Sequence, residues 1–323
     1  MKKKSSLSIL MYHYVRDLKA SRYPSIKGLD LALFRQQLDY LSDEGFVCID
    51  AELLLSALSS EATLPDKAVL LTFDDGYIDH YTNVFPELKK RGISAFFSMP
   101  GRIIAEKKLL DVNKIHFLLA SMGTEEILAN LFERLDYYRG KECDYPSNDD
   151  LYAKLASASR YDTADVIFIK RVLQVELDEQ VRKSIVDDLF FQNVAVSEQA
   201  FAKELYMNIE QVAHMRREGM CFGIHGYDHY WMNRLTGDEL DEDIEKALNT
   251  FTGIVDPHRW ICCYPYGSYS KEVERIIQKR GAAAGFTTKV DQARLDDYGR
   301  FELPRFDTND FPPISYNYRR MMR

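Results

Sequence analysis

Short apolar runs rich in β-prone residues alternate with amphipathic segments along much of this chain. The runs with the length and composition of strands are 8–12, 46–49, 68–73, 93–99, 220–224, 260–264 and 282–287. Several of them are almost continuously apolar, which is typical of strands buried on both faces of a sheet. Strands that alternate with helices predict an α/β fold, either a (β/α) barrel or a doubly wound open sheet.

Helical patterns fill the intervals between these runs. Apolar residues recur at helical spacing over 31–44, and Gly45 ends that pattern. Similar segments are 50–59, 84–91, 209–218, 238–250 and 271–280. Asn208 with Gln211 three residues later predicts a capping box at the start of 209–218.

One connection breaks this alternation, because residues 100–219 separate the fourth predicted strand from the fifth. A crossover helix accounts only for 209–218, so 105–203 is predicted to be an insertion. It is helical in pattern, with segments at 114–122, 124–138, 151–158, 162–176 and 178–191. Insertions of this length are usually lids or subdomains, although a structural embellishment or an oligomer contact fits the pattern too.

The remaining boundaries follow from this insertion. The barrel or sheet is expected to comprise 5–104 and 204–310, and 311–323 is expected to be a C-terminal tail. The 323 residues are 46% hydrophobic and 28% charged, as in ordinary globular proteins. The net charge of −8 argues against nucleic acid as a partner, and no apolar run is long enough to predict a membrane span. The oligomeric state is left open.

The N-terminal lysines resemble the start of a signal peptide, but His13, Arg16 and Asp17 interrupt the apolar run before any small-residue cleavage site. We therefore expect a mature protein that starts at Met1 and stays in the cytoplasm. The five cysteines are scattered and form no C-x-x-C pair, which favours reduced thiols.

Chemically competent side chains follow several predicted strands directly. Asp74 and Asp75 come after 68–73, and Gly76 then allows a turn. Taken alone, Asp-Asp-Gly is more often a solvated turn. His225 and His229 follow 220–224 with H-x-x-x-H spacing, which suits a metal site but equally two surface histidines.

A carboxylate from another strand end would complete a set of two His and one Asp. Such a set leaves coordination positions for water, which is the layout of a catalytic metal site. The turn 264–267 follows another strand and either simply reverses the chain or directs the backbone N–H of Tyr266 at an oxyanion. His13 follows the first strand. The other histidines (His80, His116, His214 and His258) are interpreted as structural or surface groups.

Three segments together resemble a known family. The sequences TFDDG at 72–76, HGYDH at 225–229 and YPYG at 264–267 are similar to the first three motifs of the polysaccharide deacetylases, carbohydrate esterase family four with its NodB-homology domain. The resemblance covers about 5–104 and 204–310. It implies a distorted (β/α)7 barrel with the helical insertion between strands four and five.

The resemblance also implies roles for these residues. Asp75, His225 and His229 would hold a divalent metal, with zinc expected, and Asp74 would be the general base. The backbone N–H of Tyr266 would help to hold the oxyanion, and the metal would lower the pKa of a water toward ~7.

The sequence departs from the family pattern at several positions. Gly226 stands where Ser or Thr is usual, so a hydrogen bond behind the metal ligands is expected to be missing. Cys263 stands where the family has the Arg that orients the base, and Arg305, in a Leu-Pro-Arg element, is the expected substitute.

The usual C-terminal Leu-x-His motif is absent, but 10–15 resembles the N-terminal His element of the branch that includes the poly-N-acetylglucosamine deacetylases. His13 would then be the acid, with a structural role as the alternative.

The function implied is a metal-dependent hydrolase that removes an N-acetyl group from an acetamido sugar, in a polysaccharide or an intracellular glycoconjugate precursor. Two alternatives stay open at this point. The barrel could be inactive and bind a glycan or a partner protein, or it could hydrolyse O-acetyl esters on the same scaffold.

Overall fold

The computed structural model describes residues 6–141, 143–194 and 197–322, and it separates the chain into two compact units. The barrel unit contains the chain up to Asp17, then Gly28–Lys107, and the chain from Ala202 onward. The helical unit contains Leu18–Lys27 and Lys108–Phe201. The segment Leu18–Lys27, which the sequence pattern placed with the barrel, is therefore grouped with the insertion.

A curled, mainly parallel sheet forms the centre of the barrel unit. Its strands run in the spatial order β1, β5, β6, β7, β8 and β9, with β4 paired to β5. Their bounds are β1 Ser6–Tyr12, β4 Val47–Cys48, β5 Ala68–Phe73, β6 Phe96–Met99, β7 Cys221–Ile224, β8 Trp260–Cys263 and β9 Ala282–Phe286. Each of the predicted strands is present, and the barrel-like α/β class is confirmed.

The C-terminal part of the chain joins the two sides of this curled sheet. Leu303 pairs in parallel with Phe286 of β9. A few residues later, β11 (Phe306–Asp307) pairs in parallel with β1, and β10 (Ala293–Arg294) pairs antiparallel with the other end of β1. The segment that carries Arg305 is therefore held between β9 and β1.

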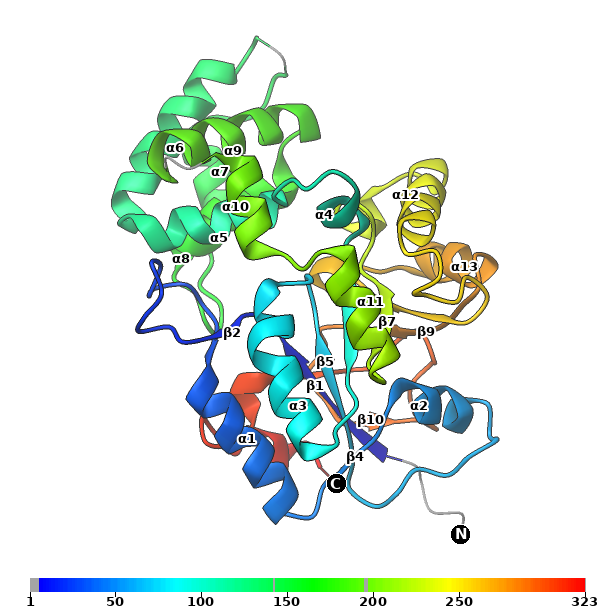
Figure 1. Cartoon of the computed structure of the whole chain (residues 1–323). Helices are drawn as coiled ribbons and strands as arrows, with labels where there is room; N and C mark the ends of the chain where they lie inside the picture. The colour runs from blue at the N-terminus through cyan, green and yellow to red at the C-terminus, as the bar shows by residue number, and fades with distance from the viewer. Residues whose placement is uncertain (1–5, 142, 195–196, 323) are drawn as a thin grey trace. The chain divides into compact units, whose positions relative to one another are not determined.

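Helices lie around the outside of the sheet (Figure 1). They are α1 Leu31–Asp43, α2 Ala51–Leu58, α3 Phe85–Arg91, α4 Gly101–Ala105, α11 Ile209–Arg217, α12 Gly237–Thr250 and α13 Lys271–Lys279. The predicted capping box is present at α11, where the Asn208 side chain accepts the Gln211 amide and the Gln211 side chain accepts the Asn208 amide. A π-helical turn, η1 (His80–Val84), precedes α3.

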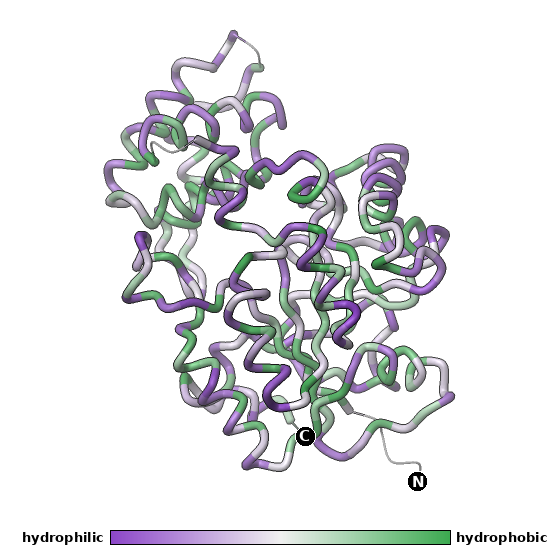
Figure 2. The backbone as a smooth tube through the Cα atoms, in the orientation of Figure 1, coloured by the Kyte–Doolittle hydropathy of each residue, from purple (hydrophilic) through white to green (hydrophobic). Residues whose placement is uncertain are grey.

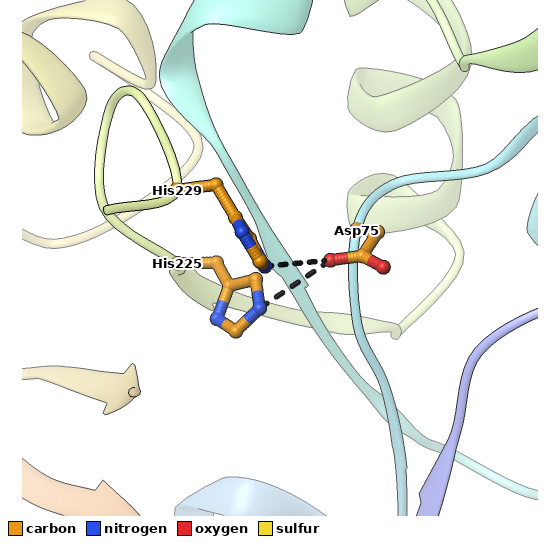
Figure 3. Close-up of side chains that lie close together, drawn as sticks. All are labelled: Asp75, His225 and His229. Atoms are coloured by element: carbon orange, nitrogen blue, oxygen red, sulfur yellow. Dashed lines mark ion pairs between the residues drawn. The ribbon is translucent and has the colours of Figure 1, made fainter. Parts of the chain in front are cut away.

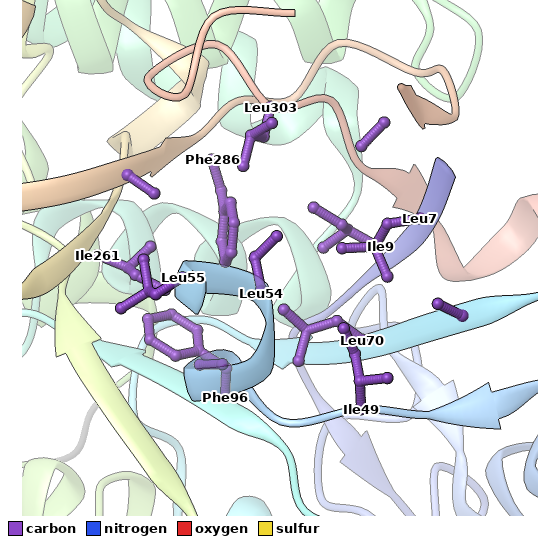
Figure 4. Close-up of a cluster of buried hydrophobic side chains, with 14 of the residues drawn as sticks. Leu7, Ile9, Ile49, Leu54, Leu55, Leu70, Phe96, Ile261, Phe286 and Leu303 are labelled. Atoms are coloured by element: carbon purple, nitrogen blue, oxygen red, sulfur yellow. The ribbon is translucent and has the colours of Figure 1, made fainter. Parts of the chain in front are cut away.

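Apolar side chains from the strands and from α2 fill the interior of the barrel unit. Figure 4 shows this cluster, with Leu7, Ile9, Leu70, Phe96, Ile261, Phe286 and Leu303 directed at Leu54 and Leu55. Figure 2 shows the same division along the backbone, with hydrophobic residues on the strands and hydrophilic ones on the outer helices. Burial of this apolar surface stabilises the sheet that carries the polar strand ends.

The chain after the barrel also packs on it. Phe311 and Tyr318 are buried and stack with ring centroids 4.1 Å apart, and Tyr318 meets the hydroxyl of Tyr40 on α1 at 2.5 Å. The segment interpreted from sequence as a tail is thus part of the barrel unit. Among the described residues, no helix combines the length and apolar character that crossing a membrane requires.

The helical unit has an apolar core of its own. Its helices are α5 Asp111–Ser121, α6 Thr124–Tyr138, α7 Asn148–Leu155, α8 Ala164–Arg171, a π-helical turn η2 Val172–Glu176 and α9 Glu179–Val194; α10 Glu198–Leu205 crosses the boundary between the units. Fully buried residues such as Leu131, Phe168 and Leu189 form that core. The helical pattern predicted for the insertion is therefore found.

Candidate active site

The polar residues predicted at the strand ends meet at one end of the curled sheet. Asp74 and Asp75 follow β5, His225 follows β7, and His13 follows β1. Because these strands are parallel and neighbouring, their carboxyl ends lie on the same side of the sheet. This topology brings together residues that are far apart in sequence.

Asp75, His225 and His229 form the group that suits a metal ion. The Nε2 atoms of both imidazoles lie 3.4 Å from Oδ1 of Asp75, and one ligand atom from each residue falls within 4.8 Å of the others. All of them are buried. Figure 3 shows both rings on the loop after β7 directed at the Asp75 carboxylate.

The donor set fits a divalent metal. Oδ1 of Asp75 is buried without a hydrogen-bond partner, while Oδ2 accepts the hydroxyl of Tyr77 at 2.6 Å. Nδ1 of His225 lies 2.7 Å from the carbonyl oxygen of Cys263, so Nδ1 carries the proton and Nε2 keeps its lone pair. Two imidazoles and one carboxylate are a ligand set that zinc accepts with positions left open.

The surroundings of the two histidines act on them in opposite directions. Burial lowers the pKa of His229 and favours the neutral imidazole, which is the form that binds a metal. Burial would also lower the pKa of His225, but the carboxylates of Asp75 and Asp74 outweigh it and raise that pKa. The negative charge of the two aspartates thus attracts positive charge to the site.

Asp74 is buried beside the metal group and is held by two side chains. The Arg305 guanidinium places Nη1 3.0 Å from Oδ1 and Nη2 2.8 Å from Oδ2, and the Ser98 hydroxyl donates to Oδ1 at 2.5 Å. Burial alone would raise the pKa of Asp74, but the Arg305 charge outweighs it, with smaller contributions from His225 and His13, so the pKa lies well below its usual range. Asp74 is therefore a carboxylate at neutral pH.

Arg305 reaches this place from the segment between β9 and β1. Its Nε donates to the carbonyl oxygen of Thr287 at 3.0 Å, and Nη1 lies 3.7 Å from Sγ of Cys263. The guanidinium thus lies against the position where the family motif has its Arg. A charge-assisted, two-point contact of this kind fixes both the position and the ionisation of a carboxylate.

Several of these residues have unusual backbone conformations. Asp75, His229 and Tyr266 have positive φ values of 75°, 61° and 58°, in the left-handed region that disfavours side chains with a Cβ. The Tyr266 ring lies edge-on to His229, with centroids 4.7 Å apart, and stacks on Trp231. Such strain is concentrated at functional sites, and here it coincides with residues predicted from the sequence.

His13 is linked to the site through its backbone. Its carbonyl oxygen accepts a hydrogen bond from Nε2 of His80 at 2.9 Å. His80 is fully buried, and burial lowers its pKa to about 4. The sequence places His80 among four histidines interpreted as structural or surface groups; it is buried, and the pattern gave no sign of its contact with His13.

Ser98, Tyr77 and Asp243 also contact the site from neighbouring elements and were not predicted from the sequence. Tyr77 directly follows Asp-Asp-Gly, so its closeness in sequence was a signal. Ser98 lies in the next strand of the sheet, β6, and Asp243 on a helix, and neither belongs to a recognisable motif. Their positions become visible only in three dimensions.

A family model described as polysaccharide deacetylase matches residues 61–129 and 189–285 of this chain. The Bacillus subtilis (strain 168) protein YxkH, whose name assigns it to the polysaccharide deacetylases, is 33% identical over 303 residues, which are 94% of this chain and 71% of that protein. The poly-β-1,6-N-acetyl-D-glucosamine N-deacetylase of Escherichia coli (strain K12) is 37% identical over 81 residues, which are 25% of this chain and 12% of that protein.

A solved structure shows the same fold. The Streptococcus pyogenes deacetylase PplD in complex with acetate superposes with a TM-score of 0.58 at 18% identity, covering 99% of this chain and 100% of that one. The family model matches segments in both parts of the predicted barrel and more than half of the chain, and the YxkH match spans most of both chains. The chain therefore belongs to the polysaccharide deacetylase family of carbohydrate-deacetylating enzymes.

Proposed function

We propose that this enzyme is a metal-dependent N-deacetylase that hydrolyses the acetamido group of a sugar in a glycan. The observation that carries the proposal is the buried Oδ1 of Asp75, which accepts no hydrogen bond and lies 3.4 Å from the Nε2 atoms of His225 and His229, beside the ionised Asp74. A buried carboxylate oxygen without a partner is costly unless something occupies the space in front of it. A divalent cation held by Asp75, His225 and His229, with zinc as the expected ion, would satisfy it.

When bound, such a metal supplies a water of lowered pKa, near ~7, and a positive charge for the acetyl oxygen. Asp74 then acts as general base and accepts the proton of the water that attacks the acetyl carbonyl carbon. Arg305 and Ser98 hold the Asp74 carboxylate still while it does so. A carboxylate fixed in advance requires little rearrangement at the moment of reaction.

The tetrahedral intermediate needs a donor for its oxygen and an acid for its nitrogen. We assign the donor to the backbone N–H of Tyr266, whose left-handed turn lies against His229. We assign the acid to His13, because an amine leaves poorly unless it is protonated as the C–N bond breaks. The products are the free amino sugar and acetate.

The substrate class is supported by the comparison with the N-deacetylase of E. coli, whose name specifies poly-β-1,6-N-acetyl-D-glucosamine. We therefore propose an N-acetylated glycan or glycoconjugate as the substrate. The presence of the base and of every predicted metal ligand in one buried group argues against an inactive barrel.

The test is acetate release by the full chain, stripped of metal and reloaded with zinc. The substrates are N-acetylglucosamine oligomers, with an O-acetylated glycan as the ester arm. We expect acetate release from the N-acetylated oligomers, dependent on zinc. Zinc-independent release, or release from the ester alone, would overturn the proposal.

A further inference from the structure

The short turn between the two predicted histidine ligands is held from two sides. It comprises Gly226, Tyr227 and Asp228. On one side, the carbonyl oxygens of Gly226 and Tyr227 accept hydrogen bonds from the amides of Gly101 and Arg102, at 3.1 and 3.0 Å. These amides belong to the first turn of α4, whose N–H groups have no partner within the helix. The Arg102 side chain also pairs with the carboxylate of Asp228 at 2.8 Å.

On the other side, a single carboxylate on α12 holds the same turn. Oδ2 of Asp243 accepts the amide of Tyr227 at 2.9 Å, and Oδ1 accepts the amide of Asp228 at 3.1 Å. Asp243 is 7% exposed. A carboxylate can accept at both oxygens, whereas an amide side chain would direct its own N–H groups at one of these backbone amides.

Asp243 is a buried charge whose contacts are directed at this turn. Burial raises the pKa of Asp243 to about 6, although the amides of Tyr227 and Asp228 oppose the shift. In the described part of the chain, the structure shows no salt bridge to Asp243. A buried carboxylate without a counter-ion is costly, and the two backbone hydrogen bonds are the contacts that stabilise this one.

The carboxylate of Asp243 lies close to the backbone at position 226, where glycine leaves room for it. Gly226 has φ +69°, and a Cβ placed on it would lie 3.0 Å from Oδ2 of Asp243. A side chain at 226 and the carboxylate at 243 would therefore compete for the same space. Where the family pattern has Ser or Thr, this chain has Gly226, and the two amides that follow it donate hydrogen bonds to Asp243.

We propose that Asp243 is a positioning residue that fixes the loop from His225 to His229, and with it both imidazole rings, in the arrangement that binds the metal. This inference rests on the proposed function, because it concerns the affinity of the same metal group. Groups that orient metal ligands from behind change metal affinity by about 10–100-fold when they are removed.

The experiment measures zinc affinity rather than activity. Metal-stripped wild-type chain, Asp243→Asn and the control Asp50→Asn are titrated with Zn²⁺ in competition with a chromophoric chelator. Asp50 is a matched control because its side chain also accepts a backbone amide, that of Leu53 at the start of α2, away from the site. We expect ~10–100-fold weaker zinc binding for Asp243→Asn, wild-type binding for Asp50→Asn, and similar melting of the zinc-free proteins.

The outcomes separate the two proposals. If the wild-type chain does not bind zinc, the proposed function fails. If it binds zinc and folded Asp243→Asn binds equally well, only the role of Asp243 is overturned. Should Asp243→Asn fail to fold, Asp243→Ser is titrated in the same way, because it leaves room for water at the two amides. Weaker zinc binding would support the role of Asp243, and unchanged binding would overturn it.

Discussion

The two units of this enzyme bury charged groups in opposite ways. In the helical unit, Lys114 is almost fully buried, but its ammonium group is 2.5 Å from Asp187 and 3.1 Å from Glu198, carboxylates that are themselves partly exposed. Those side chains raise the pKa of Lys114 against the effect of burial. The ammonium group of Lys114 is therefore paired with carboxylates, as in a structural ion pair.

In the barrel unit, by contrast, the buried charged side chains of Asp74, Asp75 and Arg305 lie close together, and one carboxylate oxygen lacks a hydrogen bond. Oδ1 of Asp75 accepts no hydrogen bond, and the Nε2 atoms of two imidazoles lie 3.4 Å from it. The difference teaches that burial and charge alone do not identify a functional site. What distinguishes the barrel site is that one carboxylate and two imidazoles, all buried, lie close enough together to hold a metal ion.

The largest expected effect comes from separating the two aspartates of the barrel unit. Asp75→Ala should lose both zinc and activity, because it removes a ligand. Asp74→Asn should keep zinc and lose activity ~10²–10⁴-fold, the range expected for a general base. Metal analysis with acetate release checks both. If both variants kept zinc and full activity, the assignment of the site would fail.

Asp74→Asn also leaves Arg305 without its carboxylate. Because a buried charge that loses its partner costs about 3–5 kcal/mol, the free energy of unfolding of this variant should drop. Circular dichroism should therefore show that the protein is folded at the assay temperature before its activity is interpreted.

The next effect tests whether the helical unit is independent of the chemistry. Phe168→Ala removes a fully buried ring from the core of this unit, and it should destabilise that unit by about 3–5 kcal/mol. Zinc affinity should stay unchanged, since none of the predicted ligands lies in that unit. Phe191→Ala is the control, because Phe191 is 77% exposed in the same unit. A loss of zinc affinity in Phe168→Ala alone would break the division between the units.

The sequence predicted the parts of the molecule that depend on local pattern. The apolar runs identified every strand that frames the site, and helical periodicity identified the insertion. Asp74, Asp75 and His225 come at the ends of strands, and His229 lies four residues after His225. Parallel strands bring such ends together, and the resemblance to the family motifs singled these residues out.

The remaining residues of the site come close to it only when the chain is folded, so no local pattern predicts them. Ser98 donates to Asp74 from the neighbouring strand, and Asp243 reaches the histidine loop from α12. Neither position carries a pattern that distinguishes it from an ordinary strand or helix residue. Arg305 was found only through its resemblance to a family element, and its contact with Asp74 follows from the closure of the sheet by the segment that carries it.

A smaller effect is expected from removing the proposed proton donor, His13, while the metal ligands of the barrel unit stay intact. His13→Ala should lower amide hydrolysis by about 10²-fold, because the leaving amine then lacks its acid. Hydrolysis of an acetate ester should fall less, since an alkoxide leaves more easily than an amine. The comparison of kcat for the two substrates checks this. Equal losses on both would assign His13 to structure instead.

The smallest effect concerns His80, a buried group of the barrel unit that holds the backbone of His13. Its pKa is about 4 in the folded protein, against 6.5 for an ordinary histidine, because burial disfavours the charged ring. The unfolded chain therefore binds the proton more tightly, and stability is lost as the pH falls from 6.5 toward 4. Between pH 7 and 5.5 this amounts to about 1 kcal/mol, given ~1.4 kcal/mol per pKa unit.

His80→Gln keeps an N–H donor for the carbonyl of His13 but does not titrate in this range. Its free energy of unfolding, measured by urea titration of the zinc-free protein, should therefore fall less between pH 7 and 5.5 than that of the wild type. His258→Gln is the control, because His258 is exposed, and it should keep the wild-type slope. If all three proteins showed the same slope, His80 would not be the buried neutral group that holds the end of β1, and His13 would owe its position to the sheet alone.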